Sequence, residues 1–253
     1  MDVQYDDEHV LPSVTEALAS ANAAGVAKVI QVGCDLASSI WAADIAASYP
    51  DVWATVALHP NAAAHDPTLQ DSLAEIATLA KLPQVRAIGE TGLDYFRTGP
   101  EGIAAQEESF REHIEIAKAV GKPVVIHDRD AHDDVVRILD EQGAPATVVF
   151  HCFSGGVELA KICAERGWYT SFSGTVTFKN APHLREAAAL MPVDLLLVET
   201  DSPFLTPTPY RGRPNSSALI PLTVRAISAT RGESEQEICQ ALFSNAARVF
   251  GPF

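Results

Sequence analysis

The sequence has few cysteines, no long hydrophobic run and no apolar leader. Only four of its 253 residues are cysteines, and none of them forms a C-x-x-C pair. A chain of this length does not need disulfides for stability, so we expect reduced thiols in a cytoplasmic protein. The absence of any run of about 18 apolar residues excludes a membrane-spanning helix. Segment 1–10 is acidic and contains no apolar stretch, so we expect no signal peptide there.

Positive charge is also scarce. The chain has 18 Lys and Arg against 33 Asp and Glu, which gives a formal net charge of −15. Proteins that coat nucleic acids present broad basic surfaces, so the composition argues against that class. It does not exclude an enzyme that contacts a few phosphates, because bound divalent cations can reverse the local charge of an acidic site.

Short apolar runs rich in Val and Ile alternate with Ala- and Leu-rich stretches at helical spacing. The predicted strands are 28–33, 52–59, 85–90, 122–127, 146–151, 168–174 and 194–200. The predicted helices are 13–24, 38–48, 71–81, 103–120, 132–142, 157–166, 183–190, 218–230 and 233–250. Continuous apolar strands indicate a parallel sheet covered on both faces, either doubly wound or closed into a barrel. No linker interrupts the pattern, so we expect one domain over 1–253.

Polar residues at strand ends distinguish a barrel from an open sheet. His59, Glu90, His127, His151 and Asp201 each lie at or just past the C-terminal end of a different predicted strand. An open sheet gathers ligands at one switch point, whereas a barrel brings every strand end to one mouth. The pattern therefore predicts an α/β fold of the TIM-type (β/α) barrel class. Such a barrel needs eight strands. Only seven are visible, and residues 1–10 make a poor strand, so we expect the first strand to be missing.

Four of these residues form a candidate metal site. Two imidazoles and two carboxylates offer mixed nitrogen and oxygen ligands, a set that suits Zn²⁺, Mn²⁺ or a similar ion. A single histidine at a strand end is usually structural, but four such residues at four strand ends favour metal binding. Carboxylates can also bridge two ions, the arrangement used for in-line displacement at phosphorus. We therefore predict Glu90, His127, His151 and Asp201 as metal ligands.

Local motifs make the chain resemble the TatD family of metal-dependent deoxyribonucleases. The matching segments are GETGLDYFR (89–97), IHDRDAHDD (126–134), HCFSG (151–155), VETDSPFLTP (198–207), ALHPN (57–61) and PYRGRPN (209–215). They occur in the family's order from about residue 26 to the C-terminus. The resemblance implies a TIM-type barrel that hydrolyses DNA phosphodiesters with two divalent metal ions, Mg, Mn or Zn. The expected substrate is single-stranded DNA or strand ends, and the expected state is a monomer.

The resemblance also assigns roles within the site. It implies that Glu90 and Asp201 are catalytic: Glu90 would bridge two cations, and Asp201 would hold the first and orient or deprotonate the attacking water. His127 and His151 would hold the second cation. Strand alternation puts Glu199 on the same side as Asp201 but one layer deeper, where it would support a ligand by a hydrogen bond.

One piece of the family pattern is missing from this sequence. The family carries an H-x-H pair on its first strand, whereas the only early histidine here is His9 and no second histidine pairs with it. The absent strand and the absent pair are therefore the same segment. We expect the first metal site to be weakened by this loss. A start codon placed too far downstream would explain it, and so would a degenerate paralogue.

Several residues near the strand ends are candidates for contact with substrate. His59 could line the pocket, and Arg129 could contact a phosphate or pair with Asp133. Arg211 and Arg213 could clamp a phosphate or belong to a solvated loop. Tyr95 and Phe96 could stack on a base or pack in the core. The remaining histidines outside segment 1–10 are expected on the surface: His65, His113, His132 and His183.

Three other functions stay open at this point. A lactonase or amidohydrolase on the same barrel often uses a carboxylated Lys as the bridging ligand, but the comparable strand end here is Glu90. A deacylase acting on D-aminoacyl-tRNA would use the same site. A truncated chain of this kind could instead be a catalytically impaired metal-binding protein.

Overall fold

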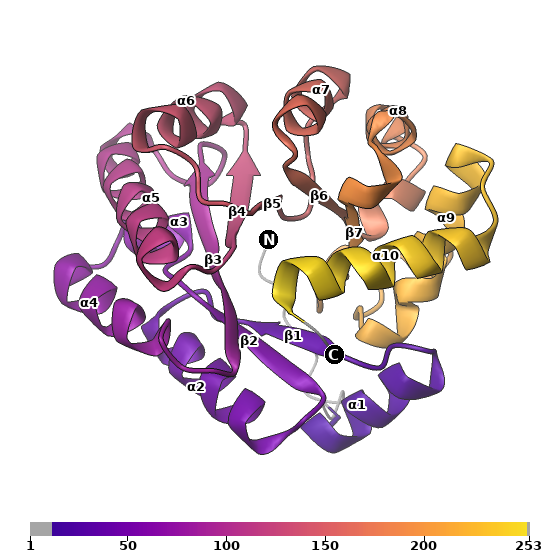
Figure 1. The fold of residues 1–253 in the computed structure, drawn as a ribbon, viewed down its shortest axis with the longest axis horizontal. Helices are drawn as coiled ribbons and strands as arrows, with labels where there is room; N and C mark the ends of the chain where they lie inside the picture. Colours follow the sequence, from indigo (N-terminus) through magenta and orange to yellow (C-terminus); the bar gives the residue numbers. More distant parts are fainter. Residues whose placement is uncertain (1–11, 252–253) are drawn as a thin grey trace.

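Seven parallel strands form one curled sheet in which the spatial order of the strands is the order of the chain. The computed structural model describes residues 12–251, and Figure 1 shows these strands arranged around a common centre. The strands are β1 (Val29–Val32), β2 (Val52–Val56), β3 (Val85–Asp94), β4 (Val124–Arg129), β5 (Val148–Phe150), β6 (Tyr169–Phe172) and β7 (Leu196–Val198). Each neighbouring pair is parallel and joined through a helix on the outside, so the expected TIM-type barrel with seven visible strands is confirmed.

The helices lie within three residues of the predicted ranges. They are α1 (Val14–Ala23), α2 (Leu36–Ser48), α4 (Leu69–Leu79), α5 (Pro100–Val120), α6 (His132–Gln142), α7 (Val157–Arg166), α8 (Pro182–Leu190), α9 (Ile220–Arg231) and α10 (Glu235–Phe250). The sequence pattern missed four short elements, α3 (Pro60–Ala63), η1 (Gly174–Thr177), η2 (Val193–Leu195) and η3 (Ser217–Leu219). Capping boxes start three of the helices, where Ser13, Asp35 and Ser234 each accept a hydrogen bond from a backbone N–H of the first turn.

The two outer strands of the described sheet each have one neighbour. Within residues 12–251, β1 pairs only with β2 and β7 only with β6. A closed barrel of this class has eight strands, so the described part of the chain lacks one. Segment 1–10 and His9, on which the expectations of a poor strand and a leaderless N-terminus were based, lie outside the described residues. No helix in the described part is long and apolar enough to cross a membrane.

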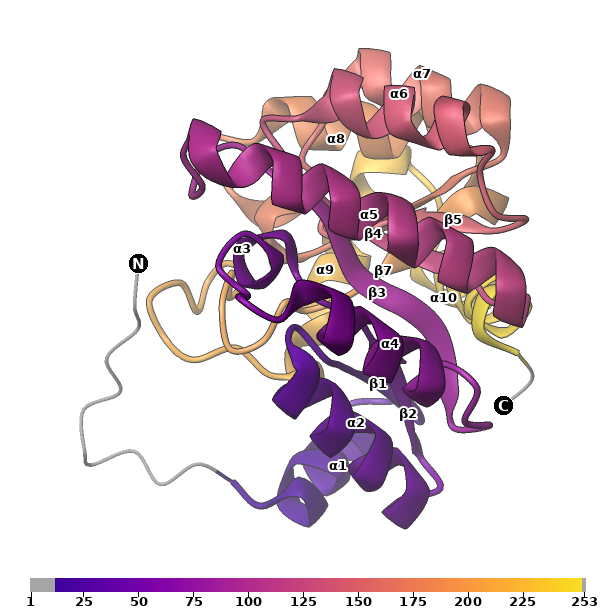
Figure 2. The same ribbon diagram turned by 90° about the vertical axis from the view of Figure 1, so that its left-hand side faces the viewer.

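Apolar side chains fill both the layer outside the sheet and the end of the barrel opposite its mouth. All five residues of β2 are buried, as expected for a strand covered on both faces. The inner cluster consists of Ala87, Val125, Val149 and Leu197 from four strands, with Val249 of α10 packed against them. Figures 1 and 2 show α10 lying across this end of the barrel. The strands' C-terminal ends therefore form the mouth that is open to solvent.

His113 of α5 is fully buried, so the prediction that it lies on the surface was wrong. Its Nε2 accepts the backbone N–H of Leu58 at 3.0 Å, and its Nδ1 donates to the carbonyl of Ser109 at 2.6 Å. His113 belongs to the buried helical stripe that also contains Phe110, Ile114 and Ala117. That spacing, i, i+3, i+4 and i+7, was the available signal for an inward-facing histidine. The contact joins α5 to the segment that follows β2.

Burial lowers the pKa of His113 from 6.5 to about 4, with partial compensation by its bond to Ser109. Between these pH values the unfolded chain binds a proton that the folded chain does not. The free energy of unfolding should therefore fall by roughly 3 kcal/mol through this residue as the pH drops from about 6.5 to about 4. We expect His113→Gln, which retains an acceptor for Leu58 N–H, to remove this part of the decline. Urea unfolding at several pH values measures it, and parallel curves for the variant and the parent would contradict it.

Candidate metal centre

A buried carboxylate oxygen at the barrel mouth contacts three imidazoles. Glu90 Oε1 lies 2.6 Å from His127 Nδ1, 3.3 Å from His151 Nε2 and 3.6 Å from His59 Nε2. Asp201 Oδ1 lies 3.6 Å from the same Nε2 of His151. The structure thus brings the four expected ligands together from β3, β4 and the segments after β5 and β7. It also adds His59, which follows β2, to the same cluster.

Glu90 lies inside β3 and not at its end, because this strand continues to Asp94. The β3–β4 register shifts between Ile88 and Thr91, and such a bulge redirects the side chains within it. Two glycines permit it. A Cβ on Gly89 would lie 2.5 Å from Val125 Cβ, and one on Gly92, whose φ is +139°, would lie 2.1 Å from the carbonyl oxygen of His127. The close approach of the two backbones therefore requires glycine at both positions.

Glu199 and Asp201 both lie next to His151, but the backbone that positions them is not the continuous strand that the sequence predicted. Strand β7 ends at Val198, and Asp201 has a left-handed φ of +57°, so the alternating pattern does not extend to it. Even so, Glu199 Oε2 lies 2.9 Å from His151 Nδ1, the nitrogen that faces away from Glu90. Asn215 holds the segment by donating to the carbonyls of Thr200 and Phe204, each at 2.7 Å. Glu199 therefore sits behind His151, and Asp201 sits in front of it.

Asp94 is a site residue that the sequence reading missed. Its Oδ2 lies 3.2 Å from Nε2 of His127, and its side chain is almost fully buried. The residue is part of the same GETGLDYFR motif as Glu90 and lies four positions later. The bulge brings the two carboxylates to opposite edges of the His127 ring. Motif membership was the only sequence signal, because their convergence on one histidine depends on the register of β3 against β4.

The three imidazoles differ in pKa because their surroundings differ. Burial lowers the pKa of His59 to about 4, so its ring is neutral. Burial would also lower the pKa of His127, but its hydrogen bonds to Asp94 and Glu90 outweigh burial and raise that pKa to about 9. The pKa of His151 lies well above its usual range, since Glu199 and Glu90 outweigh its burial. Burial raises the pKa of Glu90, yet the three imidazoles outweigh it, and the carboxyl stays ionised.

The donor set fits a divalent cation. Ligand atoms of His59, Glu90 and His127 lie within 4.8 Å of one another, and no Lys or Arg side chain among residues 12–251 is paired with any of them. A second group, His151, Cys152 and Glu199, is equally close but less suitable. Burial raises the pKa of Cys152, which leaves a protonated thiol beside Ser173, at 3.2 Å between Sγ and Oγ. Mixed imidazole and carboxylate donors around Glu90 are the better match to zinc, manganese or magnesium.

The three arginines expected to contact substrate lie exposed around the mouth and make no ion pair with an acid in the described part of the chain. The guanidinium of Arg129 lies 4.2 Å from the centre of the Phe96 ring, so the alternative of a pair with Asp133 is wrong. Arg211 stacks on Phe178 at 3.7 Å, and Arg213 lies 5.8 Å from the Tyr210 ring.

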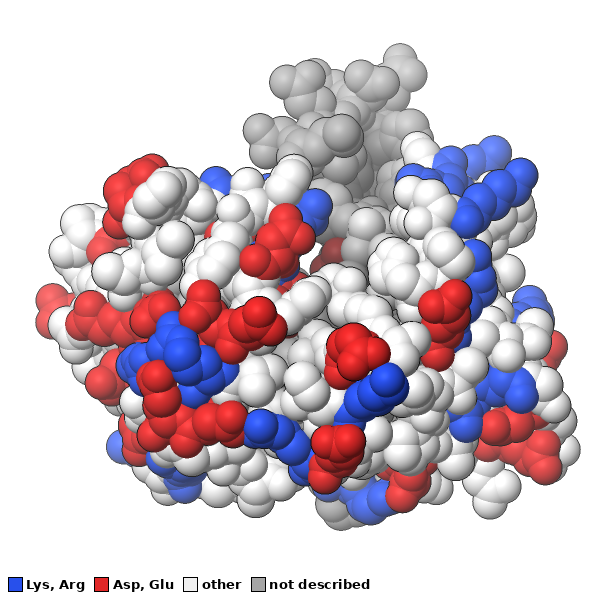
Figure 3. All heavy atoms as spheres, turned by 90° about the horizontal axis from the view of Figure 1, so that it is seen from above, with Lys and Arg blue, Asp and Glu red and all other residues white. Residues whose placement is uncertain are grey.

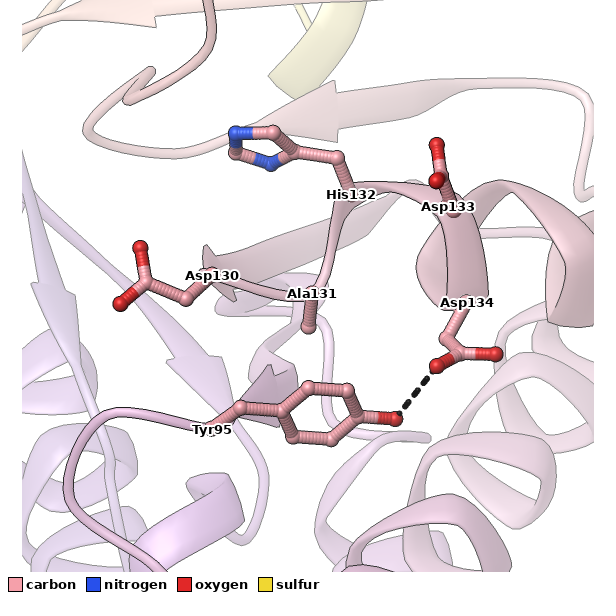
Figure 4. A pocket seen from close by; sticks show the side chains of 6 residues that line it. All are labelled: Tyr95, Asp130, Ala131, His132, Asp133 and Asp134. Atoms are coloured by element: carbon pink, nitrogen blue, oxygen red, sulfur yellow. Dashed lines mark hydrogen bonds between the residues drawn. The ribbon is translucent and has the colours of Figure 1, made fainter.

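A pocket of about 350 Å³ opens beside the cluster, at the start of α6, and is shown in Figure 4. It is lined by Tyr95 and by residues 130–134, which contribute three aspartates and His132. Tyr95 donates its hydroxyl to Asp134 at 2.9 Å at the rim of the pocket, and its partly buried ring packs against the hydrophobic core, one of the two alternatives expected from the sequence. His132 Nδ1 is held by Asp128 at 2.6 Å. The pocket is acidic, which makes this side of the mouth unfavourable for a phosphate.

Comparison with known proteins identifies a family and several relatives that are similar to this chain. A model of the family described as TatD related DNase matches residues 2–251. A Mycobacterium tuberculosis protein named uncharacterized metal-dependent hydrolase TatD is 45% identical over 235 residues, 91% of this chain and 88% of that protein. A Citrobacter rodentium protein named 3'-5' ssDNA/RNA exonuclease TatD is 37% identical over 93% of this chain and 91% of its own length. The crystal structure of YJJV, a TatD homologue from Escherichia coli K12, superposes with a TM-score of 0.87 at 29% identity and covers 92% of this chain and 90% of that one.

The contact between Gly92 and His127 can be tested with one added methyl group. We expect Gly92→Ala to lower the free energy of unfolding by at least about 3 kcal/mol, from the left-handed φ and from overlap with the His127 carbonyl. Gly143→Ala is the matched control, because its φ is +73° and nothing lies within 4 Å of the added Cβ. Its loss should be only about 1–2 kcal/mol. Chemical denaturation measures both, and equal losses would show that the β3–β4 approach is not constrained.

Proposed function

Since this chain belongs to the family of TatD-related DNases and is a metal-dependent hydrolase, we propose that it cleaves phosphodiester bonds of DNA, with single-stranded DNA or strand ends as substrate. The observation that carries the proposal is the position of Glu90 Oε1 within 3.6 Å of three imidazoles at the barrel mouth. The exonuclease name of the Citrobacter relative supports a nucleic acid as the substrate class. We also propose a cytoplasmic, monomeric enzyme, and the four free cysteines agree with the cytoplasmic location.

Two divalent ions, Mg, Mn or Zn, are the proposed cofactors. Glu90 would bridge them, with His127 and His151 on the second and Asp201 on the first. When bound, such ions neutralise phosphate charge and make water easier to deprotonate. The sequence contains no H-x-H pair, so the first ion would be held more weakly than the second.

The chain's own residues would orient and deprotonate the nucleophile. Asp201 is the most exposed carboxylate of the cluster, with 29% of its side chain accessible against 9% for Glu90. It is therefore the carboxylate that an incoming water reaches first, and its Oδ1 would accept the proton of that water. Glu199, which faces Nδ1 of His151 at 2.9 Å, would keep that ring directed at the cluster.

The β7–η3 loop is the proposed phosphate-binding side of the mouth. It begins at the cluster, where Phe204 donates its N–H to the carbonyl of Asp201 at 2.8 Å, and it carries Arg211 and Arg213. Figure 2 shows this loop projecting on the mouth side of the barrel. In Figure 3 red acidic side chains surround a small blue group on the side of α5 and α6, and blue basic side chains gather at the upper right, towards α8. A polyanion would therefore approach over the loop and away from the acidic pocket.

Hydrolysis of a labelled single-stranded oligonucleotide in Mn²⁺ tests the proposed reaction. We expect nucleotide release that EDTA abolishes, and a fall in kcat/KM of at least about 100-fold for Glu90→Gln and for Asp201→Asn, by analogy with losing groups at a reacting centre. Glu158→Gln is the matched control, because Glu158 is exposed on α7 and, in the described part of the chain, pairs only with Lys161. Hydrolysis of a D-aminoacyl-tRNA ester but not of DNA, with the same dependence on Glu90, would overturn the proposed substrate in favour of the deacylase.

The loop arginines should affect substrate binding and not the chemical step. We expect Arg211→Ala and Arg213→Ala each to raise KM several-fold at unchanged kcat, because exposed phosphate contacts act equally on bound substrate and transition state. Each should also reduce the slope of log KM against log salt by about 0.7. Arg225→Ala is the control, since Arg225 lies on α9 and pairs with Glu235 at 3.4 Å. An unchanged salt slope for both loop variants would contradict a phosphate contact.

A further inference from the structure

Each imidazole of the cluster has one nitrogen facing Glu90 and one facing an outer partner. The outer partner of His127 is the carboxylate of Asp94, at Nε2, and that of His151 is the carboxylate of Glu199, at Nδ1. The outer partner of His59 is different in kind. It is the backbone N–H of Asn61, which donates to Nδ1 of His59 at 3.1 Å.

The outer partner decides which ring nitrogen carries the proton. An ionised carboxylate only accepts, so Asp94 and Glu199 require a proton on the outer nitrogens of His127 and His151. Their inner nitrogens face Glu90 and carry protons while the rings are charged. Once those protons leave, the inner nitrogens become lone-pair donors, the form that binds metal. A backbone N–H only donates, so it requires a bare lone pair on Nδ1 of His59. In the neutral ring the proton is then on Nε2, which is the nitrogen that points into the cluster.

The outer partners are themselves firmly held. The Asp94 side chain is buried, and its Oδ1 accepts the backbone N–H groups of Phe96 and Arg97 at 3.0 and 2.8 Å. Gln106 of α5 bonds both the N–H and the carbonyl of Asp94. Asn61 lies in the first turn of α3, and its side-chain amide donates to Asp94 Oδ2 at 3.1 Å. One asparagine thus orients two histidines, His59 through its backbone and His127 through Asp94.

We propose that His59 is not a metal ligand but a neutral hydrogen-bond donor, whose Nε2–H contacts a non-bridging phosphate oxygen of the substrate. Its Nε2 lies 3.6 Å from Glu90 Oε1, too far for a hydrogen bond, so the N–H remains available. The ring is fixed by its edge-on contact with His127, at 4.4 Å between ring centres. A preorganised neutral donor beside the cations would stabilise negative charge that develops on the phosphate. This assignment rests on the proposed phosphodiesterase function for the identity of the acceptor.

Measurements of metal affinity can distinguish His59, the proposed hydrogen-bond donor, from His127, a proposed metal ligand. They do not require an activity assay. Titration calorimetry with Mn²⁺ should give an unchanged dissociation constant, within about 2-fold, for His59→Leu. It should give an affinity loss of at least about 100-fold for His127→Leu and about 10–100-fold for Asp94→Asn. Asp134→Asn is the control for the last variant, since this aspartate bonds Tyr95 and Arg137 at the rim of the pocket. A loss for His59→Leu equal to that for His127→Leu would overturn the assignment.

The role of His59 as a hydrogen-bond donor can be tested separately, by measuring phosphate binding. Binding of inorganic phosphate to the Mn²⁺-loaded protein should weaken about 10-fold in His59→Leu, and His59→Gln, whose amide can donate from a similar position, should restore most of it. Phosphate binding that is equally strong in parent and His59→Leu would overturn the donor. These measurements use no DNA. If the chain bound phosphate as described but did not hydrolyse oligonucleotides, the proposed substrate would fail and the assignment of His59 would stand.

Discussion

Glu90 is an anion in the interior of the molecule, and the mouth of the barrel is arranged to compensate it. Its side chain is 9% exposed, and a buried carboxylate without partners would be protonated or would destabilise the fold by several kcal/mol. Three imidazoles surround its Oε1, and two of them carry the charge that compensates it. Those two are in turn held by Asp94 and Glu199. The cluster is therefore a chain of alternating acids and bases, and a divalent cation that enters it would displace the protons of His127 and His151.

This chain of contacts depends on backbone geometry in β3 and β4. Gly89 and Gly92 let the two strands approach so closely that no side chain fits between them. The resulting bulge presents Glu90 and Asp94 to opposite sides of His127. The apolar cluster below, closed by α10, excludes water from the other end of the barrel. Rigid strands and a sealed lower end hold the polar groups of the mouth at fixed positions, which is a requirement for metal and phosphate chemistry.

The sides of the mouth differ in charge, and this difference gives the proposed substrate a direction of approach. Arginines that form no ion pair with any described residue follow β7, whereas three aspartates surround the pocket at the start of α6. A strongly acidic protein can in this way bind a polyanion at one place while repelling it elsewhere. The composition argues against a protein that coats nucleic acids, and the distribution of charge is compatible with the proposed enzyme acting on one strand.

The sequence by itself determined the order of strands and helices, the barrel class and the four residues that meet at the mouth. Hydrophobic periodicity and motif order are properties of neighbouring residues, so they can be read without coordinates. Only the tertiary structure decided the burial of His113 and the contact of Asp94 with His127. At Asp201 the structure shows a left-handed backbone conformation where the sequence pattern predicted a strand with alternating side chains. Each of these depends on which atom of one segment meets which atom of another 30 or more residues away, or on a single backbone angle, and neither is encoded in a local pattern.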